Sequence, residues 1–284
     1  MNLSKTKSLG FYIQLLLYKL LTPLECGNYR LKVFVNEFTF ILAMLGLRKL
    51  RSENREKITI RTKFGTLRIR DIDSDIAIAS PSYERQDINE LLSLMGTSLY
   101  SGNHVLFIDA GACFGKYSVA VASEFRRYRR LLTVFAFEPD PENYRLLCAN
   151  IRLNHLRNVR TFRIALSNSG ETKKFYYYAP MKQIVSSPTD KTIFIRTDTL
   201  DRLTSVYTSP HPHSLFIKLD VEEHEVQVLE GSKRLFRRFD NTILLTEDSA
   251  VTVTQKLHKY LLRNGTILVK KTPYNSFWEI RKTT

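Results

Sequence analysis

The stretch Val105-Leu-Phe-Ile-Asp-Ala-Gly-Ala-Cys-Phe-Gly115 decides the fold of this chain. It holds an apolar run that ends on an acid, Asp109, and continues into two glycines, Gly111 and Gly115. A short apolar run that is followed by glycine is typical of a buried strand and a tight turn. A helical pattern begins at once and extends from 116 to 123, so the stretch predicts a strand–turn–helix unit.

A second apolar run, from Leu131 to Phe137, ends on another acid, Glu138. An acid at the end of the second strand of such a unit suits the two ribose hydroxyls of a nucleoside. A dinucleotide site would prefer the spacing GxGxxG, whereas here Cys113 takes the intermediate position and the turn is wider. The pattern therefore predicts a nucleoside-binding α/β domain and favours S-adenosylmethionine over a dinucleotide.

Strand and helix patterns alternate along most of the chain. Strands are expected at 105–109, 132–138, 159–164, 214–219 and 242–247, and helices at 116–124, 141–153, 224–236 and 252–263. Strands that are separated by helix-length segments predict a parallel sheet with helices on both faces. Such sheets bind ligands at the carboxyl ends of their strands. Asp109, Glu138 and Asp220 fall at these ends, so we expect them to converge.

Three further segments have recognisable patterns. Residues 58–70 alternate apolar and polar around a glycine, which predicts a small hairpin. Two apolar runs within 266–280 predict a closing antiparallel hairpin, and residues 171–201 interrupt the alternation with two extra strands around a polar loop. Asp87 is expected to cap a helix that runs to Leu99.

Positive charge is concentrated in the first quarter of the chain. The net charge is +15, and residues 1–70 alone contribute fourteen Lys and Arg against four Glu. Phe11 to Leu21 and Val33 to Leu47 have the spacing of amphipathic helices, but both are too short or too interrupted to span a bilayer. The charge suits an anionic partner such as lipid headgroups or nucleic acid, or serves only as a solubilising surface.

We therefore divide the chain into two parts. Residues 1–57 are expected to form a basic amphipathic helical extension, and residues 58–284 the main domain, with its core at 85–284. The three cysteines are odd in number and widely spaced, without a metal-binding pattern, which indicates a reducing compartment. The prediction is a cytoplasmic protein. Its extension either packs on the main domain as a pair of helices or makes peripheral contact with the anionic inner face of a membrane.

Several blocks of the sequence resemble the FkbM-type methyltransferases. The blocks are Asp109–Ser118, Phe135–Leu147, Asn150–Asn154, Ala165–Asn168, Ile217–Glu225, Val228–Ser232 and Leu244–Glu247. The resemblance covers about residues 85–270. It implies a class I Rossmann-like fold with a mostly parallel seven-stranded sheet, and S-adenosylmethionine as methyl donor. Two departures stand out: the family generally has Asn where this chain has Cys113, and Gly where it has Glu223.

The resemblance and the strand ends together assign candidate site residues. The donor is expected to contact the following set: Asp109, Gly111, Ala112, Gly115, Tyr117, Glu138, Pro139 and Ala165. Methyl transfer is an in-line displacement that needs alignment and, for a hydroxyl acceptor, removal of a proton. Asp220 is the first candidate for that base or for orienting the acceptor, with Glu222 and His224 beside it. The alternative for this acidic segment is a helix N-terminus whose acids complement the dipole.

Other charged residues leave alternatives open. Asp220 with Glu222 or Glu247 could hold Mg²⁺, although no metal-ligand motif is present and no metal ligand is assigned. Lys218 either balances these acids or points to the opposite face of its strand. Arg126-Arg-Tyr-Arg-Arg130 either grips phosphate or complements the carboxyl end of a helix.

The sequence predicts an O-methyltransferase that acts on a hydroxyl of a sugar, glycolipid or related metabolite. One alternative is a nucleic-acid methyltransferase, motivated by the net charge of +15. It is disfavoured because the chain lacks an Asn-Pro-Pro-Tyr-type motif and a recognisable RNA-binding appendage. The other alternative is a non-catalytic, membrane-associated protein that keeps the fold, motivated by Cys113 and Glu223.

Overall fold

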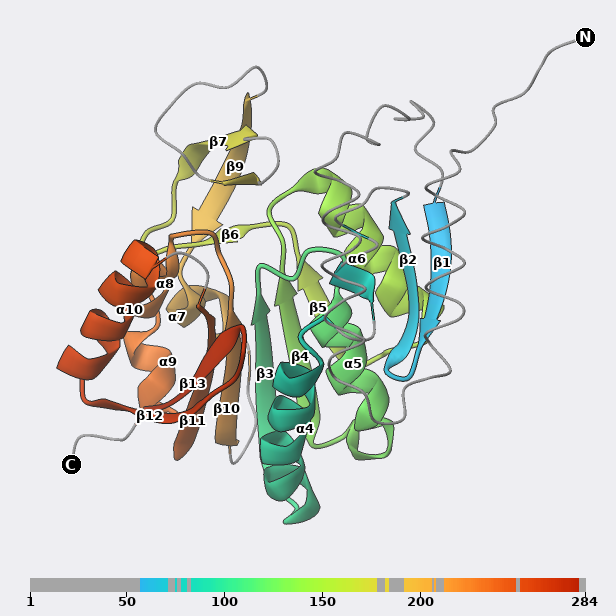
Figure 1. Cartoon of the computed structure of the whole chain (residues 1–284), viewed down its shortest axis with the longest axis horizontal. Helices are drawn as coiled ribbons and strands as arrows, with labels where there is room; N and C mark the ends of the chain where they lie inside the picture. Colours follow the sequence, from blue (N-terminus) through green and yellow to red (C-terminus); the bar gives the residue numbers. More distant parts are fainter. Residues whose placement is uncertain are drawn as a thin grey trace, which may run out of the picture. The chain divides into compact units, whose positions relative to one another are not determined.

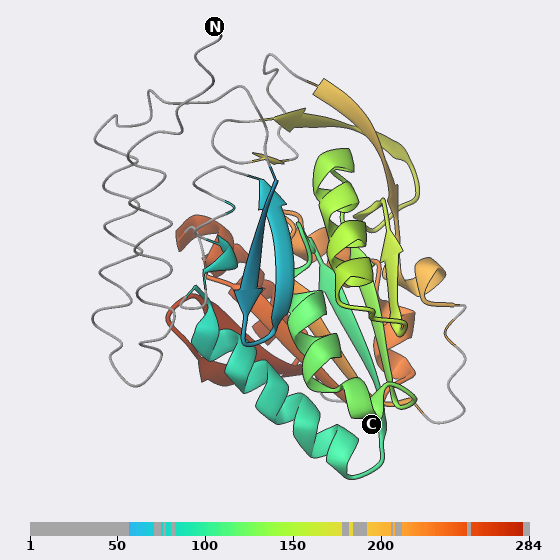
Figure 2. The same ribbon diagram turned by 90° about the vertical axis from the view of Figure 1, so that its right-hand side faces the viewer.

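The structure of the chain is a computed structural model, drawn in Figures 1 and 2. It describes residues 57–70, 75, 78–80, 83–177, 182–183, 192–205, 207, 212–248 and 251–280. The chain divides into two compact units, Met1–Arg85 and Gln86–Thr284. The expected helical extension at 1–57 lies outside the described residues apart from Lys57, which begins a strand.

The described part of the first unit contains the expected hairpin. Strands β1 (Lys57–Thr62) and β2 (Gly65–Arg70) pair in antiparallel register. The turn ends at Gly65, which has a φ of 140°, a backbone conformation that residues other than glycine rarely adopt. Leu67 and Ile69 are buried on one face of the hairpin, in line with the alternating pattern of the sequence.

The second unit is built on a seven-stranded sheet. Its strands are β3 (His104–Ala110), β4 (Leu132–Phe137), β5 (Val159–Phe162), β10 (Pro212–Leu219), β11 (Asn241–Glu247), β12 (Thr266–Lys271) and β13 (Asn275–Ile280). Their order is β12-β13-β11-β10-β3-β4-β5. All neighbours are parallel except that β13 runs antiparallel to β11 and to β12. The predictions of a mostly parallel seven-stranded sheet and of a closing hairpin are confirmed.

Helices cover both faces of the central strands. The helices are α4 (Arg85–Tyr100), α5 (Lys116–Glu124), α6 (Pro141–Leu153), α7 (Leu200–Leu203), α8 (Glu225–Glu230), α9 (Lys233–Arg237) and α10 (Val251–Arg263). Figure 1 shows α4, α5 and α6 grouped beside β3, β4 and β5, and α8, α9 and α10 grouped over the other half of the sheet. Every residue from Val105 to Ala110 is buried, and so is every residue from Ser214 to Leu219. Because successive strand residues point to opposite faces, this burial means that neither face is open.

Two helix predictions need correction. The helix expected at 224–236 is two short helices, α8 and α9, which are interrupted at Gly231. The backbone there passes so close to Ser167 that a Cβ on Gly231 would lie 2.2 Å from the Ser167 carbonyl oxygen. Asp87 does not cap its helix: it lies inside the first turn of α4, buried, and accepts a hydrogen bond from Thr272.

A smaller four-stranded sheet is inserted between β5 and β10. Its strands are β6 (Ala165–Leu166), β7 (Thr172–Tyr177), β8 (Lys182–Gln183) and β9 (Thr192–Asp198), in the order β6-β9-β7-β8. The two expected extra strands are β7 and β9, which pair antiparallel. Figure 2 shows them extending beyond the end of the main sheet. The polar loop at 181–191 lies outside the described residues apart from 182 and 183.

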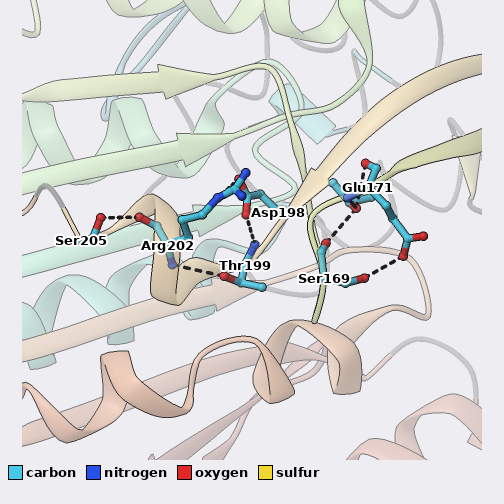
Figure 3. Close-up of polar contacts among 7 residues, drawn as sticks. Ser169, Glu171, Asp198, Thr199, Arg202 and Ser205 are labelled. Atoms are coloured by element: carbon cyan, nitrogen blue, oxygen red, sulfur yellow. Dashed lines mark hydrogen bonds and ion pairs between the residues drawn. The ribbon is translucent and has the colours of Figure 1, made fainter.

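A polar network at the base of this insertion joins its strands to the chain around them (Figure 3). Arg202 donates to Asp198 through Nε at 2.8 Å, and the hydroxyl of Thr197 donates to the Ser169 carbonyl at 2.9 Å. Ser169 Oγ also donates to the Glu171 carboxylate at 2.7 Å. This hydrogen bond, together with the hydrogen bond and the charge of Lys173, lowers the pKa of Glu171 below its usual range. These side chains tie β9 to α7 and to the segment that precedes β7.

No helix in the described ranges is long and apolar enough to cross a membrane. The two apolar segments at 11–21 and 33–47, for which amphipathic helices are expected, lie outside those ranges.

Candidate functional site

The glycine turn after β3 is pressed against the end of β10. Gly111 has a φ of 81°, and a Cβ there would lie 1.7 Å from the carbonyl oxygen of Asp220. The backbone N–H of Asp220 donates to the Ala110 carbonyl at 3.1 Å. Gly115 also has a positive φ, of 90°, and precedes the first residue of α5. The first glycine is therefore required by the approach of a neighbouring strand end, which brings Asp220 to the turn.

Asp109 is buried at the end of β3, and one of its carboxylate oxygens accepts hydrogen bonds from Ser118 in α5. Its Oδ2 accepts from the Ser118 backbone N–H at 3.0 Å and from the Ser118 hydroxyl at 2.6 Å. Its Oδ1 is buried and has no hydrogen-bond partner within the described part of the chain. Burial raises the pKa of Asp109, and Lys218 partly opposes this rise. The free oxygen is an acceptor in need of a donor.

Glu138 is held at the end of β4 by two backbone N–H groups. Its Oε2 accepts from Cys113 at 2.8 Å, and its Oε1 accepts from Asp140 at 2.8 Å. Asp140 in turn caps α6, because its Oδ1 accepts from the N–H groups of Glu142 and Asn143. Glu138 thus joins the glycine turn to the next helix.

Lys218 lies on the same side of the sheet as the acids Asp109 and Asp220. Its Nζ lies 2.6 Å from Oδ2 of Asp220, two residues further along β10, and 5.0 Å from the ring centre of Tyr117. In the sheet register Lys218 is paired with Asp109 on β3. The lysine is 5% exposed, so its charge acts in a dry environment between the two acids. It balances the acids and does not point to the opposite face.

The loop from Asp220 to Glu225 is an unusual backbone turn. Glu222 and Glu223 have φ values of 53° and 70°, two successive left-handed residues that are not glycine. The buried Glu225 carboxylate accepts from the N–H groups of Val221 at 3.3 Å and Glu223 at 3.2 Å. Burial raises the pKa of Glu225. Glu225 therefore holds the loop in shape, as the helix-terminus alternative anticipates for an acid in this position.

His224 faces the region that follows β6. Its Nε2 lies 3.0 Å from the Ser167 hydroxyl. Burial lowers the pKa of His224, and the charge of Lys173 lowers it further. A neutral imidazole beside a hydroxyl can accept or donate a proton, but no contact between His224 and Asp220 is found within the described ranges.

The remaining expected donor residues are distributed along the same chain segments. Ala112 and Tyr117 are buried in the turn and in α5, and Pro139 follows Glu138 at partial exposure. Ala165 is buried in β6, where it pairs with Thr197. Four of the expected residues, Asp109, Gly111, Glu138 and Asp220, are linked through the turn and its hydrogen bonds.

The expectation of Mg²⁺ gains no support. Among the described residues, no three His, Cys, Asp or Glu side chains are grouped so that they could hold a metal ion. Asp220 is engaged instead with Lys218, a cation that competes with a metal for the same carboxylate.

Comparison with known families decides the affiliation of the chain. The model of the methyltransferase FkbM domain matches residues 109–268, more than half of the sequence. The chain belongs to the FkbM methyltransferase family. The resemblance is confirmed, and with it an S-adenosylmethionine-dependent methyltransferase of the Rossmann-like class. A comparison with curated protein sequences found no match.

Solved structures of methyltransferases are similar to this FkbM protein at low identity. The precorrin-6y C5,15-methyltransferase from Geobacter metallireducens is 12% identical, with a TM-score of 0.41, and the match covers 68% of this chain and 88% of that one. The N-terminal domain of human METTL16, in complex with SAH, is 11% identical with a TM-score of 0.41, covering 86% and 79%.

The two departures from the FkbM pattern fall on strained backbone. Cys113 has a φ of 50° and Glu223 a φ of 70°. Asn and Gly, the residues that the family generally places there, are the two that tolerate this left-handed region best. Glu223 is exposed, so the departure strains the backbone and does not crowd the site with a charged side chain.

Two residues around the FkbM site were not assigned a role from the sequence. Ser118 holds Asp109, and Ser167 contacts His224. The pairing of Lys218 with Asp220 could have been inferred, because residues i and i+2 of a strand share a face. The contacts of the two serines depend on the approach of separate elements, for which the sequence carries no signal.

Proposed function

We propose that this protein transfers a methyl group from S-adenosylmethionine to a hydroxyl of a sugar, glycolipid or related metabolite. The observation that carries the proposal is the juxtaposition of Asp109, Lys218 and Asp220 beside the glycine turn. A buried cation and two acids at the carboxyl edge of a parallel sheet provide separate groups for a charged donor and for a hydroxyl acceptor.

The chain offers groups that fit the donor. The unpartnered Oδ1 of Asp109 is suited to an ammonium group, which would also keep this carboxylate charged in spite of its burial. Glu138 lies at the end of β4, where an acid suits ribose hydroxyls, and two backbone N–H groups fix its orientation. Ala112, Gly115, Tyr117, Pro139 and Ala165 complete the proposed donor site. When bound, the sulfonium of S-adenosylmethionine supplies an electrophilic methyl carbon.

Asp220 is the proposed base or orienting group for the acceptor. As the new O–CH₃ bond forms and the C–S bond breaks, the hydroxyl proton passes to a carboxylate oxygen and S-adenosylhomocysteine leaves. Lys218 holds one oxygen of Asp220 at 2.6 Å, which leaves the other oxygen for the acceptor hydroxyl. Glu222 and His224 are the further candidates, and His224 has the contact with Ser167 that would orient its ring.

One experiment with two variants tests the donor and acceptor roles separately. Glu138→Gln should weaken donor binding in calorimetry by about 10- to 100-fold, because a charge-assisted hydrogen bond is lost. Asp220→Asn should keep donor affinity and lower transfer by about 100-fold or more, measured with labelled donor against glycolipid, polysaccharide and RNA fractions. Glu124→Gln, an exposed acid away from the strand ends, is the control. Absence of donor binding by the unaltered protein would refute the proposal.

The same screen addresses the two rival functions. Methyl incorporation into RNA alone would replace the hydroxyl metabolite by nucleic acid as acceptor. Donor binding without transfer to any fraction, together with binding to anionic vesicles, would support the non-catalytic alternative. A cytoplasmic location and contact of the basic segment at 1–57 with a membrane face belong to this proposal as well.

A further inference from the structure

One stretch of the second unit carries an unusual concentration of arginine. Between 126 and 163 the chain has nine arginines and not one lysine, although lysine is common elsewhere in the sequence. The acids in this stretch are Glu138, Asp140 and Glu142, and the first two are buried. A guanidinium presents a planar fork that matches phosphate oxygens in pairs, which an ammonium does not. The choice of arginine alone therefore points to phosphate chemistry.

Six of these arginines lie at the amino edge of the sheet, and we call them the amino-edge cluster: Arg126, Arg127, Arg129, Arg130, Arg152 and Arg157. Four of them form the link from α5 to β4, which includes the short 3₁₀ helix η2 (Arg126–Tyr128), and two surround the link from α6 to β5. The two links touch, because the guanidinium of Arg126 donates to the Asn154 carbonyl at 2.9 Å. The two links that carry the cluster are thus neighbours, and they lie at the lower end of the strands in Figure 1.

The cluster is exposed and its charge is not neutralised. All six arginines are exposed, and none forms an ion pair with an acid within the described ranges. In sequence, Glu124 is the single acid between 110 and 137. The helix-dipole alternative accounts for cations in the last turn of α5 or α6. Six guanidinium groups without an acidic partner among the described residues exceed what one or two helix ends can use.

Aromatic rings lie beside the arginines. Tyr100, at the end of α4, is 65% exposed, and its ring centre lies 5.4 Å from that of Tyr128 in the middle of the cluster. Tyr100 also contacts the buried Phe125 edge-on at 6.2 Å, which holds the ring in place. An exposed ring that is held among cations provides a surface on which a base can stack.

We propose that the amino-edge cluster, with Tyr100 and Tyr128, binds single-stranded nucleic acid. The arginines take the phosphates of the backbone and the tyrosines stack on the bases. Strand β3 has seven residues, so this surface lies about 20 Å from the carboxyl edge where the proposed donor site lies. The surface is therefore a docking site that is separate from the methyl-transfer site, and the bound strand need not be the methyl acceptor.

An anionic lipid surface is the rival partner, and the local chemistry disfavours it. Peripheral membrane binding combines cations with exposed aliphatic or bulky aromatic side chains that enter the acyl region. Here the exposed large apolar residues beside the arginines are Tyr100 and Leu153, the latter at 37% exposure. The more strongly apolar surface of the described part is Ile267, Leu268 and Val269 on β12, at the far edge of the sheet.

The test uses the full-length protein and a fluorescent oligouridylate of about 12 nucleotides, a length within the site sizes of single-strand binders. Binding is followed by anisotropy between about 50 and 200 mM salt. Six phosphate contacts predict a slope of log K against log salt of about −4. The variant Arg127→Gln/Arg129→Gln/Arg130→Gln should reduce the slope to about −2 and lower affinity at least about 30-fold at ~0.1 M salt. Tyr100→Ala should lower affinity at least about 5-fold.

The control variant is Lys256→Gln/Lys259→Gln/Arg263→Gln, which removes the same charge from three exposed residues of α10. It should bind the oligouridylate within about 3-fold of the unaltered protein, and all variants should keep their donor affinity, which shows that they are folded. Equal losses in the two triple variants would overturn the proposal, since net charge alone would then explain binding. Binding to phosphatidylglycerol vesicles without binding to the oligonucleotide would also overturn it.

Discussion

At the scale of single residues, Glu223 is the position where this chain departs most clearly from a favourable backbone. Its φ of 70° follows the 53° of Glu222, and a non-glycine residue in this region costs about 1–2 kcal/mol. Glu223→Gly should therefore raise the free energy of unfolding by about 1 kcal/mol, measured by urea denaturation. Glu223→Gln removes the charge and keeps the strain, so it should leave the value nearly unchanged. Equal stabilisation by both variants would indicate charge repulsion instead.

Asp109 makes stability depend on pH in a defined direction. Burial raises its folded pKa above the usual 3.8, so the folded state holds the proton more tightly than the unfolded state. Its contribution is fully present below pH 3.8 and is lost as the pH rises through the raised folded pKa. Asp109→Asn, which still accepts from Ser118, should therefore gain stability relative to the unaltered protein as the pH rises. Urea denaturation of both proteins from about pH 4 to 8 measures this difference, and a constant difference would contradict it.

Some of the site residues could be placed from the sequence, and others could not. The acids at the strand ends could be placed from the strand pattern alone, because the carboxyl ends of parallel strands meet at one edge. That placement is consistent with the short approach between Gly111 and Asp220. The left-handed turn at Glu222 could not be predicted, since Glu has no preference for it and only the backbone held by Glu225 imposes it.

At the scale of elements, the positions of most strands and helices followed from periodicity, but the break in the helix after β10 did not. Its apolar spacing runs through 224–236 without a break, and a helix with one internal glycine is an acceptable pattern. The break at Gly231 lies where the backbone meets two other segments. It passes close to Ser167, which follows β6, and the Gly231 carbonyl accepts from the N–H of Asp201 in α7 at 3.0 Å. The apolar spacing of 224–236 does not predict contacts with residues that are distant in the sequence.

Substitution of this glycine should reveal how tightly α8 and α9 lie on the chain after β6. A Cβ at Gly231 would lie 2.2 Å from the Ser167 carbonyl oxygen, so Gly231→Ala must move one of the two backbones. We expect a loss of about 1–3 kcal/mol in the free energy of unfolding. Gly170→Ala is the matched control, because its Cβ would meet Arg202 at 3.4 Å, an ordinary contact. Similar losses in both variants would contradict a role for the close approach at Gly231.

At the scale of the whole molecule, positive charge is found in two regions for which different binding partners are proposed: residues 1–56 and the amino-edge cluster. Residues 1–56 hold nine Lys and Arg against four Glu, whereas the amino-edge cluster lies in the second unit. The proposed donor residues also lie in the second unit, between Asp109 and Ala165. Loss of the N-terminal segment should therefore affect contacts with anionic surfaces without altering the donor site.

Deletion of residues 1–56, which keeps the β1–β2 hairpin, separates these tasks. Donor affinity should stay within about 3-fold by calorimetry, because no proposed donor residue is removed. Cosedimentation with phosphatidylglycerol vesicles should fall, since juxtaposed basic residues contribute about 1 kcal/mol each near an anionic surface. Oligouridylate binding through the arginines of the second unit should persist. Loss of donor affinity on deletion would show that the first unit contributes to the methyl-transfer site, and unchanged vesicle binding would move the membrane contact elsewhere in the chain.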